Sequence, residues 1–489
     1  MSDNGFEGVA KSGATRAVGR GSTAEDVDEP VQSPQVLCMR SHGALLALLV
    51  STAFSASGYA ADALPVDPSD SALAVRSEAD ATCRATSARA GQLDTTFGAN
   101  GMARVRFGAD DDGGYFGLDV AGGRIVAAGW GAGGLGAIRF RLARLTASGK
   151  LDPSFGAGGR VATGWAPSTA DAAYAVAVDH QRDGGIIAMG WRDTFRSEPA
   201  NIALARYAPD GSLDAAGFGV GGKSLIDLGG AEEITDGLVL PDDAIVMVGR
   251  SDDKLLITRA SPKGTLDSSF ARGAGYLAVK VGQSAVARAV TVDANGRLLV
   301  VGSADMGGQH DPVVLRLTAE GALDRSFGAD GRVVVSEPRS DERAVSVALS
   351  PDGRMVVASD VGSAGGRELR VRRFLADGSP DVAFGTRGVA ESAVASGNMQ
   401  AEDMIVLPGG GILVVGNSGE GQPRLVRYTC NGALDAAFGV RGVLRVDLGE
   451  NGVLHTLRRY SNNQILLGGA DVGATPGPGT YGVVVRMWM

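Results

Sequence analysis

The nine residues Leu151-Asp152-Pro153-Ser154-Phe155-Gly156-Ala157-Gly158-Gly159 form the clearest copy of a phrase that recurs along the chain. Each copy carries an aspartate, and these aspartates are Asp94, Asp152, Asp214, Asp267, Asp324, Asp381 and Asp435. They lie 58, 62, 53, 57, 57 and 54 residues apart, so seven copies fill the chain from residue 92 to residue 489. Recurrence at a nearly fixed period indicates structural repeats that pack against their neighbours.

Each copy also has the pattern of four short strands. A phenylalanine follows the aspartate, a glycine opens the next strand, and a hairpin follows with a turn such as Pro351-Asp352-Gly353. Proline presets φ in such a turn, aspartate supplies a local acceptor and glycine accepts a positive φ. A third strand then ends in an arginine, as in Leu204-Ala205-Arg206-Tyr207. With 74 glycines and only 5% aromatic residues, the composition also favours short strands and tight turns.

We therefore predict an all-β fold, a seven-bladed β-propeller of four-stranded antiparallel blades that occupies residues 92–489. The first strand of each blade, for example residues 174–178, is expected innermost, and the strand after the phrase outermost. An open β-solenoid is the structural alternative, although its coils are usually shorter than these repeats.

The phrase Leu-Asp-x-x-Phe-Gly-x-x-Gly, followed by the hairpin and the Leu-x-Arg-Tyr strand, resembles the delta-60 repeat family of bacterial exported proteins. The resemblance covers residues 92–489 and implies a β-propeller-like domain in a secreted or envelope protein. It implies no activity and no functional residues.

One spacing predicts how the ring closes. In six copies an arginine precedes the aspartate by eight residues, as Arg144 precedes Asp152, so the two can form a charge-assisted hydrogen bond. Asp94 has no such arginine before it and Arg486 has no aspartate after it. We expect these two to pair with each other, with an N-terminal outer strand completing the last blade.

The N-terminal region has the pattern of an exported protein. Residues 1–38 are polar and non-periodic, and we interpret them as disordered or as an over-extended start. Residues 39–60 contain a charged start, an apolar run and small residues before a cleavage site, which predicts a signal peptide; a long n-region before it is the alternative. Residues 61–91 would link it to the ring. We expect a periplasmic or secreted protein with no membrane span in its mature chain.

Two cysteines, Cys83 and Cys430, remain after the predicted cleavage. An oxidising compartment would allow them to form a disulfide, and the alternative is two unrelated thiols. The formal charge of −9 is spread along the chain, which argues against nucleic acid as a partner. We expect a monomer whose partner is an unknown extracellular or envelope ligand, protein or glycan.

Motifs for catalysis or cofactor binding are weak. Residues 217–224 match G-x-x-x-x-G-K-S, but they are a copy of the repeated phrase and lead into a strand, whereas a phosphate-binding loop leads into a helix. We assign no catalytic residue, no metal ligand and no cofactor. Acidic residues near the inner strands, such as Glu402 and Asp403, could be solvated loop ends or could surround a cation.

The copies differ most after the second strand of each hairpin. We select Trp130, Trp191, Arg192 and Arg250 as candidate ligand-binding residues, because variable loops on a rigid scaffold often carry function. The alternative is that both tryptophans pack between blades. The predicted function is an exported, non-catalytic binding or protein-interaction module. An enzyme acting on an extracellular polymer such as a glycan, or a structural envelope protein, is the alternative.

Overall fold

The computed structural model describes residues 89–108, 112–132, 137–165, 172–194, 199–338, 340–363, 366–392, 399–419, 422–449, 451–472 and 479–489. The chain divides into two units, residues 1–49 and 50–489, and every described residue belongs to the second. The predicted disordered segment, the signal peptide and Cys83 lie outside the described residues.

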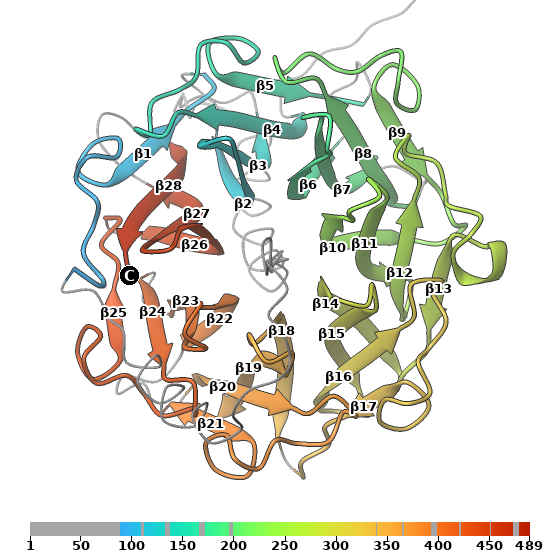
Figure 1. Ribbon diagram of the computed structural model, residues 1–489. Coiled ribbons are helices and arrows are strands. Elements are labelled where there is room, and N and C mark those ends of the chain that lie inside the picture. The colour runs from blue at the N-terminus through green and yellow to red at the C-terminus, as the bar shows by residue number, and fades with distance from the viewer. Residues whose placement is uncertain are drawn as a thin grey trace, which may run out of the picture. The chain divides into compact units, whose positions relative to one another are not determined.

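Antiparallel strands surround a central axis, and every fourth strand in chain order lies nearest to it (Figure 1). The inner strands are β2 (Asp112–Ala121), β6 (Ala172–His180), β10 (Glu232–Val239), β14 (Ser284–Val292), β18 (Asp341–Leu349), β22 (Met399–Val406) and β26 (Asn451–Ser461). The second strands are β3 (Arg124–Ala132), β7 (Ile186–Asp193), β11 (Ile245–Ser251), β15 (Leu298–Asp305), β19 (Met355–Ser363), β23 (Ile412–Ser418) and β27 (Gln464–Val472).

The third strands are β4 (Ile138–Leu145), β8 (Asn201–Tyr207), β12 (Lys254–Ala260), β16 (His310–Leu317), β20 (Gly366–Phe374), β24 (Pro423–Tyr428) and β28 (Thr480–Trp488). The outer strands are β5 (Arg160–Thr163), β9 (Lys223–Ile226), β13 (Tyr276–Val279), β17 (Arg332–Val334), β21 (Val389–Ser392), β25 (Val443–Arg445) and β1 (Met102–Val105). A short 3₁₀ helix, η1 (Ala271–Gly273), replaces the usual turn in the fourth copy.

The strands form an all-β propeller with four-stranded blades, but the predicted count of seven separate blades is wrong. Five four-stranded sheets are separate, whereas strands β2 to β9 form one eight-stranded sheet. Its two halves are joined where Ile138, at the start of β4, pairs in parallel with Ala172, at the start of β6. The repeated phrase counts copies, but it carries no information about a backbone bridge between neighbouring copies.

The N-terminal strand completes the last sheet. Strand β1 pairs antiparallel with β28, with Met102 opposite Val485 and Val105 opposite Gly482. The sheet order β1-β28-β27-β26 therefore joins the first described strand of the chain to its last three. This part of the predicted fold is present as expected.

The repeated arginine and aspartate form an ion pair, and in five copies the arginine also packs over the repeated phenylalanine; we call these three residues the clamp. Arg316 Nε donates to Asp324 Oδ2 at 2.8 Å, and its guanidinium lies 4.7 Å from the centre of the Phe327 ring. An arginine–aspartate ion pair of this kind is present in all seven copies. The seven clamp phenylalanines are at most 1% exposed.

Each clamp also contacts the next copy along the chain. Arg373 Nη1 donates to the carbonyl oxygen of Cys430 at 2.6 Å, and the amide of Gly385, next to the clamp Phe384, donates to the carbonyl of Asn431 at 2.8 Å. The last clamp does the same across the closure, since Arg486 Nη1 donates to Ala147 O at 2.5 Å. The residues of the repeated phrase therefore form a turn within one copy and also bond the next copy.

The clamp phenylalanine explains a glycine that lies three residues before each aspartate. A Cβ on Gly264 would lie 2.4 Å from Cζ of Phe218, the clamp ring of the preceding copy, and Gly264 has φ +84°. Similar clashes with clamp rings would occur at Gly149, Gly211 and Gly321. Close packing between blades thus requires glycine at this position.

We predict that Gly264→Ala destabilises the protein by about 1–3 kcal/mol more than Gly353→Ala, because overpacking is added to the strain of a positive φ. Gly353 is the matched control, since its φ is +79° and a Cβ on it would have no neighbouring atom within 4 Å. Chemical denaturation of both variants measures the difference. Equal losses would contradict the interlocking of ring and glycine.

We predict that Arg486→Met costs about 3–5 kcal/mol, because Asp94 would keep a buried charge without its partner. The Arg486 and Asp94 side chains are only 7% and 3% exposed, and their charged groups lie 2.8 Å apart. Arg250→Met is the control, since the Arg250–Glu233 pair is 45% and 33% exposed and should contribute about 1 kcal/mol or less. A loss for Arg486→Met no larger than that of the control would show that the closure does not depend on this pair.

Candidate functional site: the bulges of the inner strands

Every inner strand has a bulge at the same place. In β22, for example, Ala401 pairs with Gly416 and Asp403 with Val415, so Glu402 is left out of the ladder. The corresponding residues, which we call the bulge residues, are Phe116, Val176, Thr235, Arg288, Val345, Glu402 and His455. A bulge re-aims the side chain of its extra residue.

Opposite each bulge, the backbone of the second strand lies very close to the backbone of the inner strand. The residue paired just before the bulge is Ser359 in β19 and glycine in the other six copies, and a Cβ on Gly190 would lie 1.8 Å from Tyr174 O. The residue that follows on each second strand occupies what we call the wall position. The wall positions hold Trp130, Trp191, Arg250, Ser303, Asp360, Asn417 and Ala470.

Aromatic side chains gather on the first two copies. The Tyr174 ring stacks on Trp191 with 4.6 Å between centres, and Trp130 lies 6.4 Å from Tyr174. Both tryptophans are half-buried and pack against the apolar core between β6 and β10. The Tyr174 hydroxyl is buried and has no hydrogen-bond partner among the described residues, so this aromatic row includes a polar atom.

Charged side chains occupy the next copies. Arg250 holds Glu233 with two hydrogen bonds, from Nε at 3.0 Å and from Nη2 at 2.5 Å. Arg288 interacts electrostatically with both of these residues and also with Arg343 and Asp360. Burial, together with the charges of Arg343 and Arg250, lowers the pKa of Arg288 to about 10. Positive and negative side chains therefore alternate here, since Arg288 also faces the carboxyl group of Glu402.

Glu402 and His455 form a buried pair beside Phe116. His455 Nδ1 lies 3.3 Å from Glu402 Oε2, and the His455 ring meets Phe116 edge-on at 5.0 Å. Burial raises the pKa of Glu402 well above its ordinary value and lowers the pKa of His455 to about 4. Burial therefore favours the uncharged form of both groups.

On the inner strands β2 and β6, Asp119, Asp179 and His180 form a second cluster. The Asp119 carboxylate bonds His180 Nδ1, and Asp179 Oδ2 accepts the backbone N–H of Val239 at 2.8 Å. Burial and the charge of Asp119 raise the pKa of Asp179 to about 7. These carboxyl groups are engaged in holding adjacent inner strands together.

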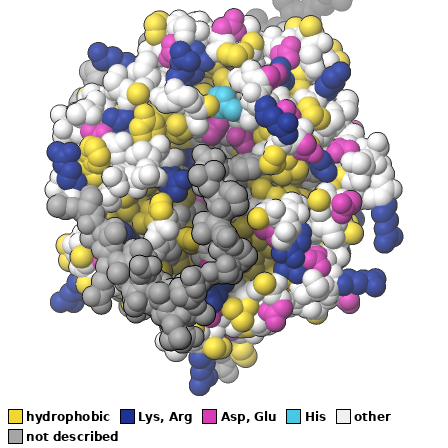
Figure 2. Space-filling model, viewed as in Figure 1, with side chains coloured by type: hydrophobic (Ala, Val, Ile, Leu, Met, Phe, Trp, Pro, Cys, Tyr) yellow, Lys and Arg dark blue, Asp and Glu magenta, His cyan; other side chains and the backbone are white. Residues whose placement is uncertain are grey.

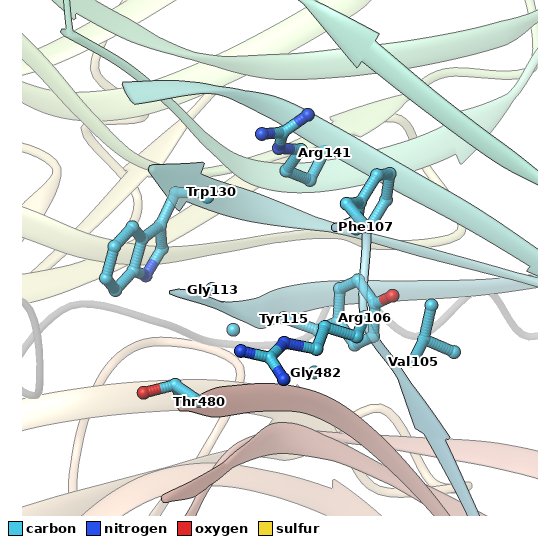
Figure 3. A pocket seen from close by; sticks show the side chains of 11 residues that line it. Val105, Arg106, Phe107, Gly113, Tyr115, Trp130, Arg141, Thr480 and Gly482 are labelled. Carbon is cyan, nitrogen blue, oxygen red and sulfur yellow. The ribbon is translucent and has the colours of Figure 1, made fainter. Parts of the chain in front are cut away.

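A small pocket of about 10 Å³, room for about one water molecule, lies where the first and last sheets meet (Figure 3). Arg106, Phe107, Tyr115, Trp130 and Arg141 come to it from β2, β3, β4 and the end of β1, and Thr480 comes from β28. The Arg141 guanidinium lies 4.9 Å from the Phe107 ring centre. This seam pocket thus combines two arginines with aromatic walls.

The structure places three of the four predicted ligand-binding residues at wall positions. These are Trp130, Trp191 and Arg250, and the first two also pack between copies as the alternative proposed. Arg192 is half-buried beside Trp191, and strand alternation directs it to the other face of the sheet. Cys430 is disulfide-bonded, while its predicted partner Cys83 lies outside the described residues.

Sequence reasoning missed Arg288, Glu402 and His455 as a set. The acidic residues expected in loops lie instead inside strands, since Glu402 and Asp403 belong to β22 and Glu232 begins β10. Asp403 accepts the N–H of Leu457 at 2.8 Å and Glu402 accepts from Asn417 at 3.0 Å, which makes their burial tolerable. Arg288, Glu402 and His455 occupy equivalent positions in their copies, so an alignment of the copies could have grouped them.

The segment that matches a phosphate-binding loop, residues 217–224, leads into a strand. Lys223 of the phosphate-loop match begins strand β9, and its Nζ donates to Gly164 O at 3.0 Å. Within the described ranges, no group of three or more His, Cys, Asp or Glu side chains is arranged to hold a metal ion. No helix in that part of the chain is long and apolar enough to cross a membrane. On the face shown in Figure 2, side chains of both charges are interspersed.

Comparison with known proteins agrees with the fold. Residues 123–155, 181–216, 294–327, 350–384 and 409–438 match the model of a family described as a domain of unknown function (DUF5122) beta-propeller. These are β-propeller repeats. No curated protein matches the chain.

Several solved structures resemble the chain at low identity. A protein of unknown function from Dyadobacter fermentans is 11% identical with a TM-score of 0.43, over 79% of this chain and 98% of that one. YCF48 bound to a D1 peptide is 12% identical with a TM-score of 0.41, over 82% and 99%. A PL25 ulvan lyase bound to a glucuronate-containing saccharide is 12% identical with a TM-score of 0.46, over 75% and 93%. These similarities assign no ligand or activity to this chain.

We predict that the wild-type protein loses stability between pH 4 and pH 7 more steeply than Asp360→Asn. Burial raises the pKa of Asp360 from 3.8 to about 7, so between these values the folded state holds a proton that the unfolded state has released. Stability therefore falls as pH rises through this window. The asparagine keeps an oxygen to accept the Ala401 N–H, a bond of 2.5 Å in the wild type.

Urea unfolding at half-unit pH steps measures this slope, with Ser359→Ala as a neighbouring buried variant that changes no titrating group. If Asp360→Asn follows the same pH profile as wild type, Asp360 is ionised in the folded protein and the prediction fails.

Proposed function

We propose that the chain is a non-catalytic binding or protein-interaction module whose site is formed by the wall positions and the neighbouring bulge residues. One observation carries this proposal. The clamp repeats the same residue types in every copy, whereas the equivalent wall positions hold Trp, Trp, Arg, Ser, Asp, Asn and Ala. A position required by the fold would repeat with it, so the varied positions are free to serve recognition.

The enzyme alternative has less support. The two His–carboxyl clusters of the inner strands are engaged in contacts between strands: Asp179 accepts the Val239 N–H, and Glu402 accepts from the Asn417 amide. The Glu402 and His455 side chains are only 1% and 8% exposed, which leaves little access for a polymeric substrate. These groups hold the wall together, and a purely structural envelope role remains the outcome if no ligand binds.

Export is part of the proposal. The disulfide at Cys430 supports it, because disulfides persist mainly in oxidising compartments such as the periplasm or the medium. The assignment to the delta-60 repeat family, with its exported members, rests on the same repeated phrase and belongs to this proposal. The predicted partner is an extracellular or envelope protein or glycan.

The test is binding of the full chain, without its signal peptide, to glycan and peptide arrays. We expect at least one class of ligand to bind, and Trp130→Ala and Arg250→Ala to weaken it about tenfold or more, the usual effect of truncating a residue central to an interface. Val440→Ala is the control, because Val440 is 78% exposed on an outer turn away from the wall.

The absence of binding to both the glycan and the peptide arrays would favour the structural role. Binding that Val440→Ala weakens as much as the wall variants would place the site elsewhere on the molecule. Turnover of a bound glycan, detected as shortened product, would favour the enzyme.

A further inference from the structure

Two hydrogen bonds join neighbouring copies at the clamps. In the first, the clamp arginine donates to the carbonyl five residues before the next aspartate, as Arg373 Nη1 does to Cys430 O at 2.6 Å. In the second, the residue after the clamp phenylalanine donates its amide to the following carbonyl, as Gly385 does to Asn431 O at 2.8 Å. Donors of the first bond are Arg144, Arg259, Arg316, Arg373 and Arg486, and donors of the second are Gly98, Gly156, Gly219, Ala271, Gly328 and Gly385.

The Arg206 clamp forms the first bond through an intermediary. Arg206 Nε donates to the side-chain oxygen of Gln181 at 2.5 Å, and Gln181 Nε2 donates to Pro262 O, five residues before the next aspartate, at 3.2 Å. Six junctions between copies therefore have both bonds.

The seventh junction, between the Arg427 clamp and the start of the described chain, lacks both bonds. Arg89 and Ala90 lie five and four residues before Asp94, so their carbonyls are the ones that the other junctions would use. Arg427 Nη1 is buried, yet it has no hydrogen-bond partner among the described residues. The described ranges likewise contain no hydrogen bond from the Gly439 amide to Ala90. A buried donor without an acceptor destabilises the contact in which it lies.

The first turn of the described chain, residues 89–92, nevertheless packs at this clamp. A Cβ on Gly91 would lie 3.3 Å from Cε2 of Phe438, the same interlocking of glycine and clamp ring that is present at Gly264. The Arg89 carbonyl accepts the amide of Gln92 at 2.9 Å, within the same turn. This first turn is thus placed by packing, without the two hydrogen bonds that join the other copies.

A covalent bond is available at the same junction. Cys430 lies three residues after Arg427 and is disulfide-bonded. The other cysteines of the sequence are Cys38 and Cys83, and cleavage of the predicted signal peptide would remove Cys38. Cys83 lies six residues before Arg89, and six residues of extended chain span about 20 Å at most. A disulfide from Cys430 to Cys83 would therefore attach the chain just before the turn that lacks the hydrogen bonds.

We propose that a disulfide between Cys83 and Cys430 replaces the two missing hydrogen bonds and holds the first turn on the ring, so that this junction opens first when the disulfide is reduced. The two cysteines are 347 positions apart, so their bond strongly restricts the unfolded chain. The inference concerns the closure of the propeller and does not depend on whether the chain binds a ligand.

The redox step is thiol–disulfide exchange with a dithiol. An oxidised dithiol takes two electrons and two protons from the thiols of Cys83 and Cys430, and their S–S bond forms as its own is broken. A reduced dithiol returns the two electrons and two protons, which breaks the S–S bond and leaves both cysteines as thiols. The junction is therefore held in an oxidising compartment and weakened in a reducing one.

The first experiment identifies the bond. The full chain, without its signal peptide, is produced in an oxidising compartment, its free thiols are alkylated, and its peptides are analysed by mass spectrometry without reduction. We expect one cross-linked pair of peptides, which joins Cys83 to Cys430.

The second experiment measures hydrogen–deuterium exchange before and after treatment of the folded protein with dithiothreitol. Peptides that cover residues 89–94 report on the first turn, where the Gly91 amide donates to Trp488 O at 2.8 Å. We expect their exchange to become about tenfold faster or more after reduction, because local opening becomes easier. Peptides that cover Gly328, whose amide donates to Asp377 O at 2.8 Å, are the control and should keep their rate.

Variants separate the disulfide from other effects of the reductant. Cys83→Ser and Cys430→Ser should each exchange like reduced wild type, and dithiothreitol should no longer change them. Cys430 contributes a backbone carbonyl to the Arg373 clamp, so the serine variant keeps that hydrogen bond. If either variant does not fold, the wild type reduced after folding provides the same comparison.

Three results would overturn the inference: Cys430 is a free thiol or is joined to a different cysteine, reduction leaves the exchange of residues 89–94 unchanged, or it accelerates the Gly328 peptides equally. Ligand binding on the arrays, by the oxidised or the reduced protein, bears only on the proposed function.

Discussion

The structure depends on the contact between an arginine, an aspartate and a phenylalanine that each copy provides. The arginine bonds an aspartate, eight residues further on in six copies and across the closure in the seventh. In five copies it packs over the phenylalanine, and in several it also donates to a carbonyl of the next copy. A buried ion pair alone gives little net stability, because desolvation of the two charges offsets their attraction. Here the same guanidinium also donates to a backbone carbonyl of the next copy and packs over an aromatic ring. One side chain therefore stabilises the turn, the buried ring and the contact with the neighbouring copy.

Because the clamps set the geometry at the outside of the ring, the inside is less constrained. At the bulge, one residue of each inner strand has no partner in the ladder. The backbone of the second strand lies so close to the inner strand there that its residue is usually glycine. The released residues range from phenylalanine to arginine, glutamate and histidine. The scaffold thus accommodates a buried Glu402–His455 pair on β22 and β26 and a set of arginines with their carboxylates on β10 to β19.

The sequence was most informative where residues repeat. Asp94 and Arg486 could be paired from spacing alone, because six other copies showed what each of them lacked. The sheet count could not be predicted, since the bridge between Ile138 and Ala172 is a backbone contact with no side-chain pattern. The bulge residues share a place in the repeat but no residue type, so the sequence could align them without showing that they leave the ladder. Glu402 and Asp403 looked like loop residues because charge is unusual inside a strand, and only the structure shows the Asn417 amide and the Leu457 N–H that accommodate them.

The closure also has a consequence for the order in which the molecule can be built. Asp94 and Arg486 are separated by 392 positions, so the outer strand of the first described segment has no partner until almost the whole propeller has been made. Pairing over such a distance carries a large loop entropy and makes folding slow. Until β28 arrives, β1 and the exposed edge of the growing ring are unpaired, which makes partly folded chains prone to associate. An unfolded chain crossing a membrane before it folds would avoid that stage inside the cell.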